Sequence, residues 1–212
     1  AWDPGVKSVD PHQSVQPYRH FTDLDIVCIR TGWQDDATHL AFRSGPPLGH
    51  RMTDILVNNE LPEWWPHPTH VHPDLNAFLI FDHGEYLAVD TGYIIPKLTR
   101  VHNTISVDGG GQLGEGQNWP IYAPYDQFAF IGKFFPAADA YYYVCGRAGN
   151  AYKPNLALEK FDRHIIMMPD SENTYFLIHD ELASAKLHNY DWRLHSASQA
   201  EIFSEQSVIE GG

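Results

Sequence analysis

The stretch from Asn76 to Asp90 reads NAFLIFDHGEYLAVD and holds two apolar, β-prone runs around the triplet Asp82-His83-Gly84. Asp and Gly tolerate the left-handed backbone conformations that tight hairpin turns need, so the triplet is a turn signal. Two such runs on either side of a short turn are typical of an antiparallel hairpin. The sequence therefore predicts paired strands over residues 76–81 and 85–90.

Further strand-like runs recur at short spacing, separated by many of the fifteen prolines and sixteen glycines. Outside the hairpin, the predicted strands are Asp25–Arg30, His39–Arg43, Thr104–Val107, Gln127–Phe135, Ala140–Cys145, Leu158–Met168, Thr174–His179, Asp191–His195 and Glu201–Phe203. No long apolar segment with a helical period of about 3.6 interrupts them. This pattern predicts an all-β fold, an antiparallel β-sandwich.

The composition is that of one domain. The 212 residues are 43% hydrophobic, which is enough for a substantial single core. Residues 1–20 are rich in Pro, His and Asp, and we expect them to form an extended lead or linker. Residues 21–212 are expected to form one sandwich domain that carries the candidate metal site.

The charge balance limits the kinds of partner. The formal net charge is −13, whereas nucleic acids and anionic membranes bind dense basic surfaces. We therefore expect neither as a partner, and no apolar run is long enough to span a bilayer. An anionic ligand would need locally placed basic groups, for which Arg43, Arg51, Lys97 and Arg100 are candidates.

Side chains suited to metal binding and proton transfer gather between residues 70 and 104. In an extended segment His70 and His72 project to the same side. Asp90 ends one predicted strand and His102 precedes another, and residues at neighbouring strand ends can converge. Imidazole and carboxylate together suit a borderline divalent ion such as zinc. Spacing alone would make His70, His72, Asp90 and His102 candidate ligands.

A structural explanation of the same residues stays open. A single histidine is more often a hydrogen-bonded structural residue than a ligand, and the chain has thirteen of them. Asp90-Thr91-Gly92 is also a plain turn sequence, and His102 is also explained as a cap at a strand end. The His70-Val71-His72 pair is the part of the pattern that chance explains least well.

Four motifs in this region resemble those of a known family. They are FRSGPP at 42–47, HVHPDLNAF at 70–78, GEYLAVDTGY at 84–93 and HNTISVDGGGQ at 102–112. In this order they resemble the heparinase II/III-like polysaccharide lyases, including the oligo-alginate lyases. The block that the motifs span, residues 42–112, covers about a third of the chain, and the β-rich remainder agrees with the resemblance.

The resemblance implies a metal, usually zinc, with Mn²⁺ or Ca²⁺ as alternatives, held by His72, Asp90 and His102. The resemblance places His70 in the catalytic cleft rather than among the metal ligands, whereas spacing alone would make His70 a fourth ligand. It implies a carbon–oxygen lyase that cleaves uronic-acid-containing polysaccharides, such as glycosaminoglycan or alginate, by β-elimination. It also implies a periplasmic or extracellular location.

Aromatic and basic residues near these motifs are candidates for binding an anionic saccharide, because aromatic faces and guanidinium groups suit such ligands. The expected substrate-binding residues are Arg43, Arg51, Trp64, Trp65, Asn76, Tyr93 and Arg100. Trp64 and Trp65 lie in a segment, 48–69, that family members usually lack. Packing of this long loop onto the core explains the two tryptophans equally well.

The beginning of the chain departs from the family pattern. The lyases carry an N-terminal α/α-toroid that supplies a tyrosine acid/base, and nothing in residues 1–30 reads as such a helical domain. The resemblance therefore implies a toroid domain or chain as a partner, and this chain would hold only part of the active site.

Two other functions remain open at this stage. The H-x-H pair with a later histidine also resembles a cupin metal barrel, which would indicate a metal-dependent oxygenase or isomerase. Asn76 stands where cupins usually have Glu, which weighs against this alternative. The domain could also be a carbohydrate-binding module without catalysis.

Overall fold

The computed structural model describes residues 10, 14–63, 70–116, 129–137, 140–170 and 173–197. Its strands are β1 (Tyr18–Phe21), β2 (Ile26–Arg30), β3 (His39–Arg43), β4 (Ala77–Asp82), β5 (Glu85–Ala88), β6 (Ile105–Val107), β7 (Phe130–Ala137), β8 (Tyr141–Arg147), β9 (Leu158–Pro169), β10 (Thr174–Ser184) and β11 (Tyr190–Trp192). One α-helix, α2 (His50–Val57), and three 3₁₀ turns, η1 (Thr99–Val101), η2 (Gly149–Ala151) and η3 (Pro154–Leu156), complete the described elements.

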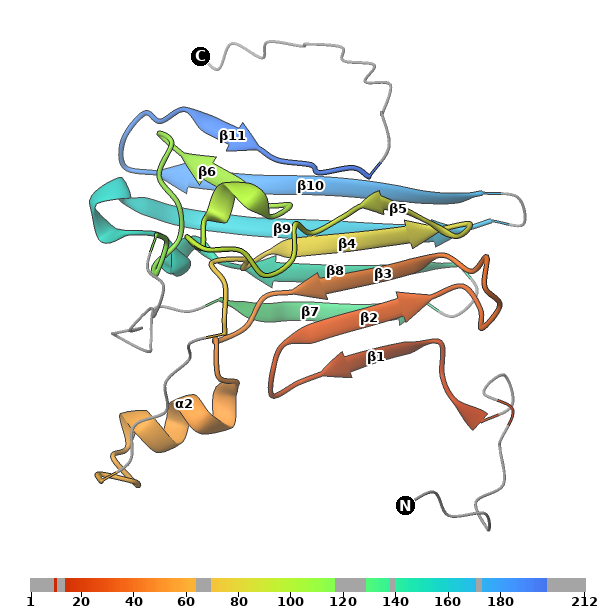
Figure 1. The fold of residues 1–212 in the computed structure, drawn as a ribbon, viewed down its shortest axis with the longest axis horizontal. Coiled ribbons are helices and arrows are strands. Elements are labelled where there is room, and N and C mark those ends of the chain that lie inside the picture. The colour runs from red at the N-terminus through yellow and green to blue at the C-terminus, as the bar shows by residue number, and fades with distance from the viewer. Residues whose placement is uncertain are drawn as a thin grey trace.

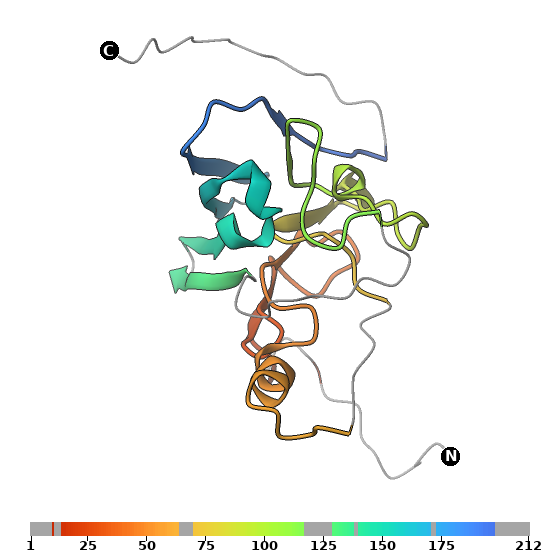
Figure 2. The same ribbon diagram turned by 90° about the vertical axis from the view of Figure 1, so that its left-hand side faces the viewer.

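The strands form two main antiparallel sheets, as the sequence predicts. One has the order β1-β2-β3-β4-β5 and the other the order β10-β9-β8-β7, while β11 and β6 form a short third pair. In Figure 1 the five-stranded sheet lies in front of the four-stranded sheet, and the turned view of Figure 2 shows the two layers side by side. The fold is an all-β sandwich, and the part of the chain that the structure describes contains no helix long and apolar enough to span a membrane.

Alternation along the strands explains the two layers. In β3 the side chains of Leu40 and Phe42 are buried, while those of His39, Ala41 and Arg43 face outward. Successive side chains of a strand point to opposite faces, so an alternating pattern buries one face only. The buried faces of both sheets join in one core, made of Val27, Ile29, Leu40, Phe42, Phe78, Ile80, Ala88, Tyr142, Val144, Ile165 and Met167.

A second apolar cluster fills the end of the sandwich beneath β6 and β11. It comprises Leu75, Ile105, Val107, Ala129, Ala148, Ala151, Tyr152, Leu156, Leu158 and Phe161. Gln112 connects this cluster to the candidate site, because its side chain accepts a hydrogen bond from the backbone N–H of Leu75 and donates one to the Leu75 carbonyl, both at 2.8 Å. The chain just before β4 is thereby held against the segment after β6.

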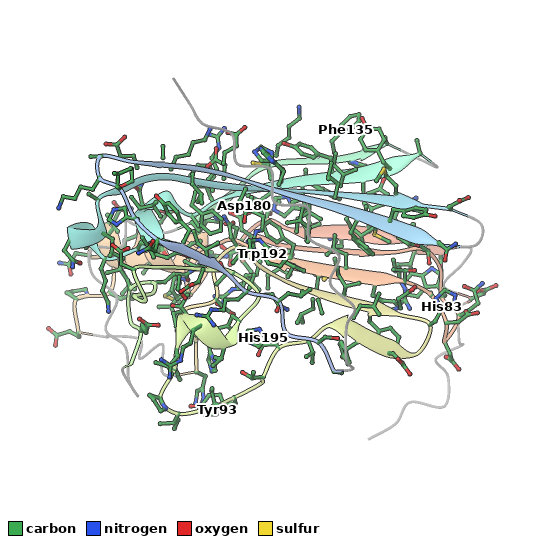
Figure 3. All side chains as sticks on the ribbon, turned by 90° about the horizontal axis from the view of Figure 1, so that it is seen from above. His83, Tyr93, Phe135, Asp180, Trp192 and His195 are labelled. Carbon is green, nitrogen blue, oxygen red and sulfur yellow. The ribbon has the colours of Figure 1, made fainter. Side chains whose placement is uncertain are left out.

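Arg163 on β9 is a fully buried cation between the sheets. It makes a two-pronged ion pair with Asp180, with Nε and NH2 at 2.7 and 2.6 Å from the two carboxylate oxygens. Its NH1 donates to the carbonyls of Asn76 and Asn103, at 2.8 and 2.7 Å. Figure 3 shows Asp180 and Trp192 in the middle of the molecule, and the Arg163 guanidinium lies 5.7 Å from the Trp192 ring.

The described strands confirm most of the predicted ones, with ends shifted by one to five residues, and His39–Arg43 has the predicted bounds. One strand and the α-helix were missed, as were the three 3₁₀ turns. β1 pairs with β2 from Tyr18 onward, so the expected boundary between lead and domain at residue 20 falls inside a strand. Helix α2 lies below the strands in Figure 1 and was not predicted. The predicted strand Glu201–Phe203 lies outside the described residues.

Candidate functional site

A pocket of about 430 Å³ opens where the five-stranded sheet meets the loop that follows β5. Its polar lining comes from Arg43 on β3, from His72 and Asp74 before β4, and from Asp90 and His102 around that loop. All four motifs, which are separate in sequence, therefore meet in one hollow, because β3 and β4 are neighbours in the sheet and the loop after β5 returns across their ends.

His102 and Asp90 form one of the two shortest polar contacts between residues that line the pocket. His102 Nδ1 lies 2.5 Å from Asp90 Oδ2, and the backbone N–H of Gly92 donates to Asp90 Oδ1 at 2.7 Å. Burial alone would raise the pKa of Asp90, but the hydrogen bonds from His102 and Gly92 outweigh it and the net shift is downward. An ionised carboxylate only accepts hydrogen bonds, so Nδ1 carries the proton.

The second ring nitrogen of His102 is left without a partner. The side chain is 1% exposed, and Nε2 is buried with no hydrogen-bond partner among the residues described. In the neutral tautomer that carries its proton on Nδ1, Nε2 presents a lone pair. A buried acceptor of this kind is costly unless a donor or a metal ion satisfies it.

His72 lies beside His102 in the pocket, and Tyr93 lies beside His72. The rings of His72 and His102 are 5.3 Å apart between centroids, and Tyr93 lies 5.3 Å from His72 and 5.7 Å from His70. Burial and the neighbouring His102 both lower the pKa of His72, so its imidazole is held in the neutral form that binds metal ions. Figure 3 shows Tyr93 at the outer edge of the molecule, on the side opposite Phe135.

The donor set fits a divalent metal ion in its chemistry. His72 offers a neutral imidazole, Asp90 offers a carboxylate, and His102 offers its buried Nε2, which lacks a partner among the described residues. In the described part of the chain, however, no group of three His, Cys, Asp or Glu side chains is already arranged around one point as ligands. Both oxygens of Asp90 accept hydrogen bonds, although each retains a further lone pair.

Comparison with known proteins places this domain in a family. Residues 17–209 match the family model described as heparinase II/III-like, C-terminal. The chain belongs to this family. The match confirms the resemblance drawn from the motifs, and it favours the lyase alternative over the cupin barrel.

Solved structures agree with the assignment at the level of fold. A heparinase III superimposes on this heparinase-like domain with a TM-score of 0.60 and 19% identity, covering 86% of this chain and 24% of its own. Heparan sulfate lyase HepC from Pedobacter heparinus gives a TM-score of 0.57 and 17% identity, covering 83% and 23%. The chain thus spans about a quarter of these proteins, and no curated protein matches it.

The heparinase-like domain brings part of the predicted site together. Arg43, His72, Asp90, Tyr93 and His102 all line the one pocket. Their proximity agrees with the predicted site, while their roles in catalysis, substrate binding or metal binding stay predictions. Exposed His70 is adjacent, through its contact with Tyr93.

One predicted substrate-binding residue is corrected by the structure. Asn76 is 0% exposed and its amide nitrogen donates to the carbonyls of Gly146 and Phe161, both at 3.2 Å. Asn76 has a left-handed backbone with φ of 57°, which Asn tolerates better than most residues. It therefore connects β4 to the opposite sheet instead of facing a ligand.

Other predicted residues lie away from the pocket or outside the description. Arg51 is exposed on α2, where its backbone N–H donates to Asp23 Oδ1, and Arg100 is exposed in η1. Neither lines the pocket. Trp64 and Trp65 lie outside the described residues.

Sequence reasoning missed one charged group at the site, Asp74, and did not foresee that Lys97, named above as a basic candidate, is buried beside the site. Asp74 lies in the pocket lining and makes a 2.5 Å ion pair with Arg43. Its place inside the HVHPD motif was the available signal. Lys97 is buried with its ammonium 5.1 Å from the centre of the Tyr93 ring, and burial lowers its pKa. No sequence pattern marked Lys97 as buried, because the loop that covers it has no regular periodicity.

Proposed function

We propose that this domain forms one wall of the active site of a polysaccharide lyase that cleaves uronic-acid-containing polymers by β-elimination. The observation that carries the proposal is the convergence of His72, Asp90 and His102 with Arg43 and Tyr93 in one pocket. The family match supports the class of enzyme. Heparan sulfate, which the name of one structural neighbour gives as its substrate, is the first candidate polymer.

In the proposed reaction, the proton on the carbon next to the uronate carboxylate is removed and the C4–O bond breaks. The electron pair of the C–H bond becomes a C4–C5 double bond, and the leaving oxygen takes a proton. The difficult step is the build-up of negative charge on the carboxylate, which neighbouring cations and hydrogen-bond donors stabilise.

His70 is the proposed catalytic residue of this chain. It is exposed at the rim of the pocket, in ring contact with Tyr93, so a bound sugar can reach its imidazole. We assign it to stabilising the developing charge or to moving the proton. Arg43 and Tyr93 are proposed to bind the sugar, the first by its charge and the second by its ring face.

A zinc ion, or alternatively Mn²⁺ or Ca²⁺, is proposed to be held by His72, Asp90 and His102. When bound it would supply a fixed positive charge that orders the pocket wall behind the substrate. The unpartnered Nε2 of His102 and the lowered pKa of His72 support this assignment. His72 and Asp90 then act as positioning residues for His70 and Tyr93.

The rest of the active site is proposed to come from outside this chain. The structural neighbours are about four times as long as the matched region. An N-terminal α/α-toroid would supply the tyrosine acid/base, and the complete enzyme would act in the periplasm or outside the cell on an anionic polysaccharide or oligosaccharide.

The test is turnover by the complete enzyme carrying His70→Ala, with heparan sulfate and alginate as substrates. Near-ultraviolet absorbance of the unsaturated uronate reports cleavage. We expect turnover to fall by about 10²–10⁴-fold, the usual contribution of a proton-transferring group, while the metal content stays unchanged. His83→Ala is the matched control, since His83 is an exposed histidine in the β4–β5 turn (Figure 3).

Two results would count against the proposal. Full turnover by His70→Ala would remove this residue from the mechanism. Absence of any unsaturated product from the complete wild-type enzyme, together with retained saccharide binding, would make the domain a carbohydrate-binding module instead.

A further inference from the structure

The pocket continues across the outer face of the five-stranded sheet. A second hollow, of about 620 Å³, lies over β1, β2 and β3 beneath residues 14–17, and a third, of about 340 Å³, lies between β3, β4 and β5. Ala41 lines all three. The hollows are therefore contiguous on the face that is turned toward the viewer in Figure 1.

Strand register explains the depression at the centre of this face. Ala41 on β3 lies directly between Cys28 on β2 and Leu79 on β4, and all three side chains face outward. The small side chains of Cys28 and Ala41 leave a trough at the middle of this face, and the aromatic pair Phe81 and Tyr86, with ring centroids 5.2 Å apart, flanks it toward β5. The trough runs from Arg43 at one end of β3 to His39 at the other, about 13 Å for four residues of strand.

The end of the trough at His39 carries a built cationic group. The guanidinium of Arg30 lies 4.1 Å from the centre of the Trp33 ring. Its Nε donates to the Gly32 carbonyl at 2.5 Å, and one terminal nitrogen lies 2.9 Å from His39 Nε2. Burial and the charge of Arg30 lower the pKa of His39, so its ring accepts the hydrogen bond as the neutral form. Arg30 is thus fixed in orientation by three neighbours.

The charge at this end is unbalanced. The second hollow is lined by Arg19 and Arg30, and no Asp or Glu is among the described residues that line it. The chain as a whole has 27 acidic and 14 basic residues, so a basic hollow runs against its general charge. Arg43, in the first pocket, is by contrast already paired with Asp74.

We infer that this trough binds acidic sugar residues of the polymer beyond those held at the His72 pocket, with Arg30, stacked on Trp33, as the principal anion-binding group. The inference rests on the proposed function, because it extends the same substrate. A guanidinium held flat against an aromatic ring presents its edge to a carboxylate or sulfate, and the ring of Trp33 offers an apolar face to the sugar.

The test uses the 212-residue chain and isothermal titration calorimetry. The probes are heparan sulfate and alginate oligosaccharides, each as a disaccharide and as an octasaccharide, with a neutral glucan octasaccharide as the reference. The variants are Arg30→Gln, Arg30→Lys and the control Arg147→Gln. Arg147 is an exposed arginine on the opposite sheet, 3.6 Å from Asp162. Thermal melting of each variant reports folding.

We expect Arg30→Gln to weaken octasaccharide binding about tenfold, the loss expected for one charge-assisted contact, and to leave disaccharide binding unchanged. Arg30→Lys should keep part of the affinity, because the charge remains but the planar fork is lost. Arg147→Gln should bind both lengths as the wild type does. A preference for heparan sulfate over alginate would identify sulfate as the recognised group, and equal affinity would identify the carboxylate.

Three outcomes would overturn the inference. If octasaccharides bind no tighter than disaccharides, the trough holds no sugar, although the proposed function of the pocket stands. If no acidic saccharide binds while the complete enzyme still cleaves polymer, the trough is not a subsite of this domain. If Arg30→Gln changes self-association in sedimentation and leaves saccharide binding unchanged, the face is an interface between copies of the chain.

Discussion

Arg163 and His102 are buried polar groups close to the same motifs, and they differ in how many of their nitrogen atoms have hydrogen-bond partners. Arg163 donates four hydrogen bonds, two to Asp180 and two to the carbonyls of Asn76 and Asn103. His102 is equally buried, but only its Nδ1 has a partner and its Nε2 has none among the described residues. A closed network stabilises the fold, whereas an open acceptor is available to a ligand.

The contacts of Arg163 explain why the two groups are near each other. Its NH1 contacts the backbone of Asn76, which follows the HVHPD segment, and of Asn103, which follows His102. Arg163 therefore holds in place the two segments that carry His72 and His102. This division of roles matches the general need of a functional site for rigid support from residues that do not react.

A second histidine–aspartate pair, His188 with Asp108, provides an internal control for His102 with Asp90. His188 Nδ1 lies 2.6 Å from Asp108 Oδ2, and His188 Nε2 also has no partner among the residues described. The pair resembles His102 and Asp90, but His188 has Tyr190 beside it where His102 has a second histidine. The proposed metal site requires the second histidine, so the two pairs should respond differently to metal.

The largest expected effect on stability comes from removing the Arg163 guanidinium. Arg163→Met should lower the free energy of unfolding by about 3–5 kcal/mol, because it leaves the carboxylate of Asp180 nearly buried and unpaired. Urea denaturation measures the change. The control Arg193→Met removes an exposed pair with Asp191 and should cost less than about 1 kcal/mol. Equal losses in the two variants would show that the buried network is not what connects the sheets.

The next effect sharpens the contrast between the two histidine–aspartate pairs. Zinc at one hundred times its dissociation constant should stabilise the wild type by about 2.7 kcal/mol. His72→Ala should abolish this gain and the bound zinc, whereas His188→Ala should retain both. Melting temperature with and without zinc, together with elemental analysis, measures the difference. An unchanged zinc effect in His72→Ala would rule out the proposed ligand set.

The smallest effect concerns the dependence of stability on pH. The hydrogen bond from His188, aided by the backbone N–H of Asn189, lowers the pKa of Asp108 from its usual 3.8. A carboxyl group with a lowered folded pKa stabilises the protein above pH 3.8 and loses that contribution as the pH falls through the folded value. Asp108→Asn should therefore be slightly less stable than the wild type at pH 6 and equally stable near pH 2. A constant difference across this range, measured by thermal melting, would contradict the assignment.

The strand pattern could be predicted from the sequence because local chemistry determined it. The alternation of His39 to Arg43 and the Asp82-His83-Gly84 turn needed no tertiary information, and the structure confirms both as β3 and as the β4–β5 turn. β1 was missed because Tyr18–Phe21 alternates too briefly to stand out. Helix α2 was missed because its eight residues are too few for a helical period to stand out in the sequence.

The candidate site was predictable only in part. Motifs indicated His72, Asp90 and His102, and the structure brings them to one pocket. The same motifs indicated Asn76 as a substrate-binding residue, but the structure buries it between the sheets. A motif shows that a residue is needed, but whether it faces a ligand or the core depends on which segments pack over it.

The sequence by itself determined the sandwich class, the family and the residues of the histidine cluster, because turn chemistry, strand period and motif order are local properties of the chain. Only the tertiary structure decided the partners of those residues. The ion pair of Arg163 with Asp180, the open Nε2 of His102 and the trough from Arg43 to Arg30 depend on strand register and on the approach of distant segments. Burial, and with it the energetic value of each polar group, is a property of packing that no single stretch of sequence contains.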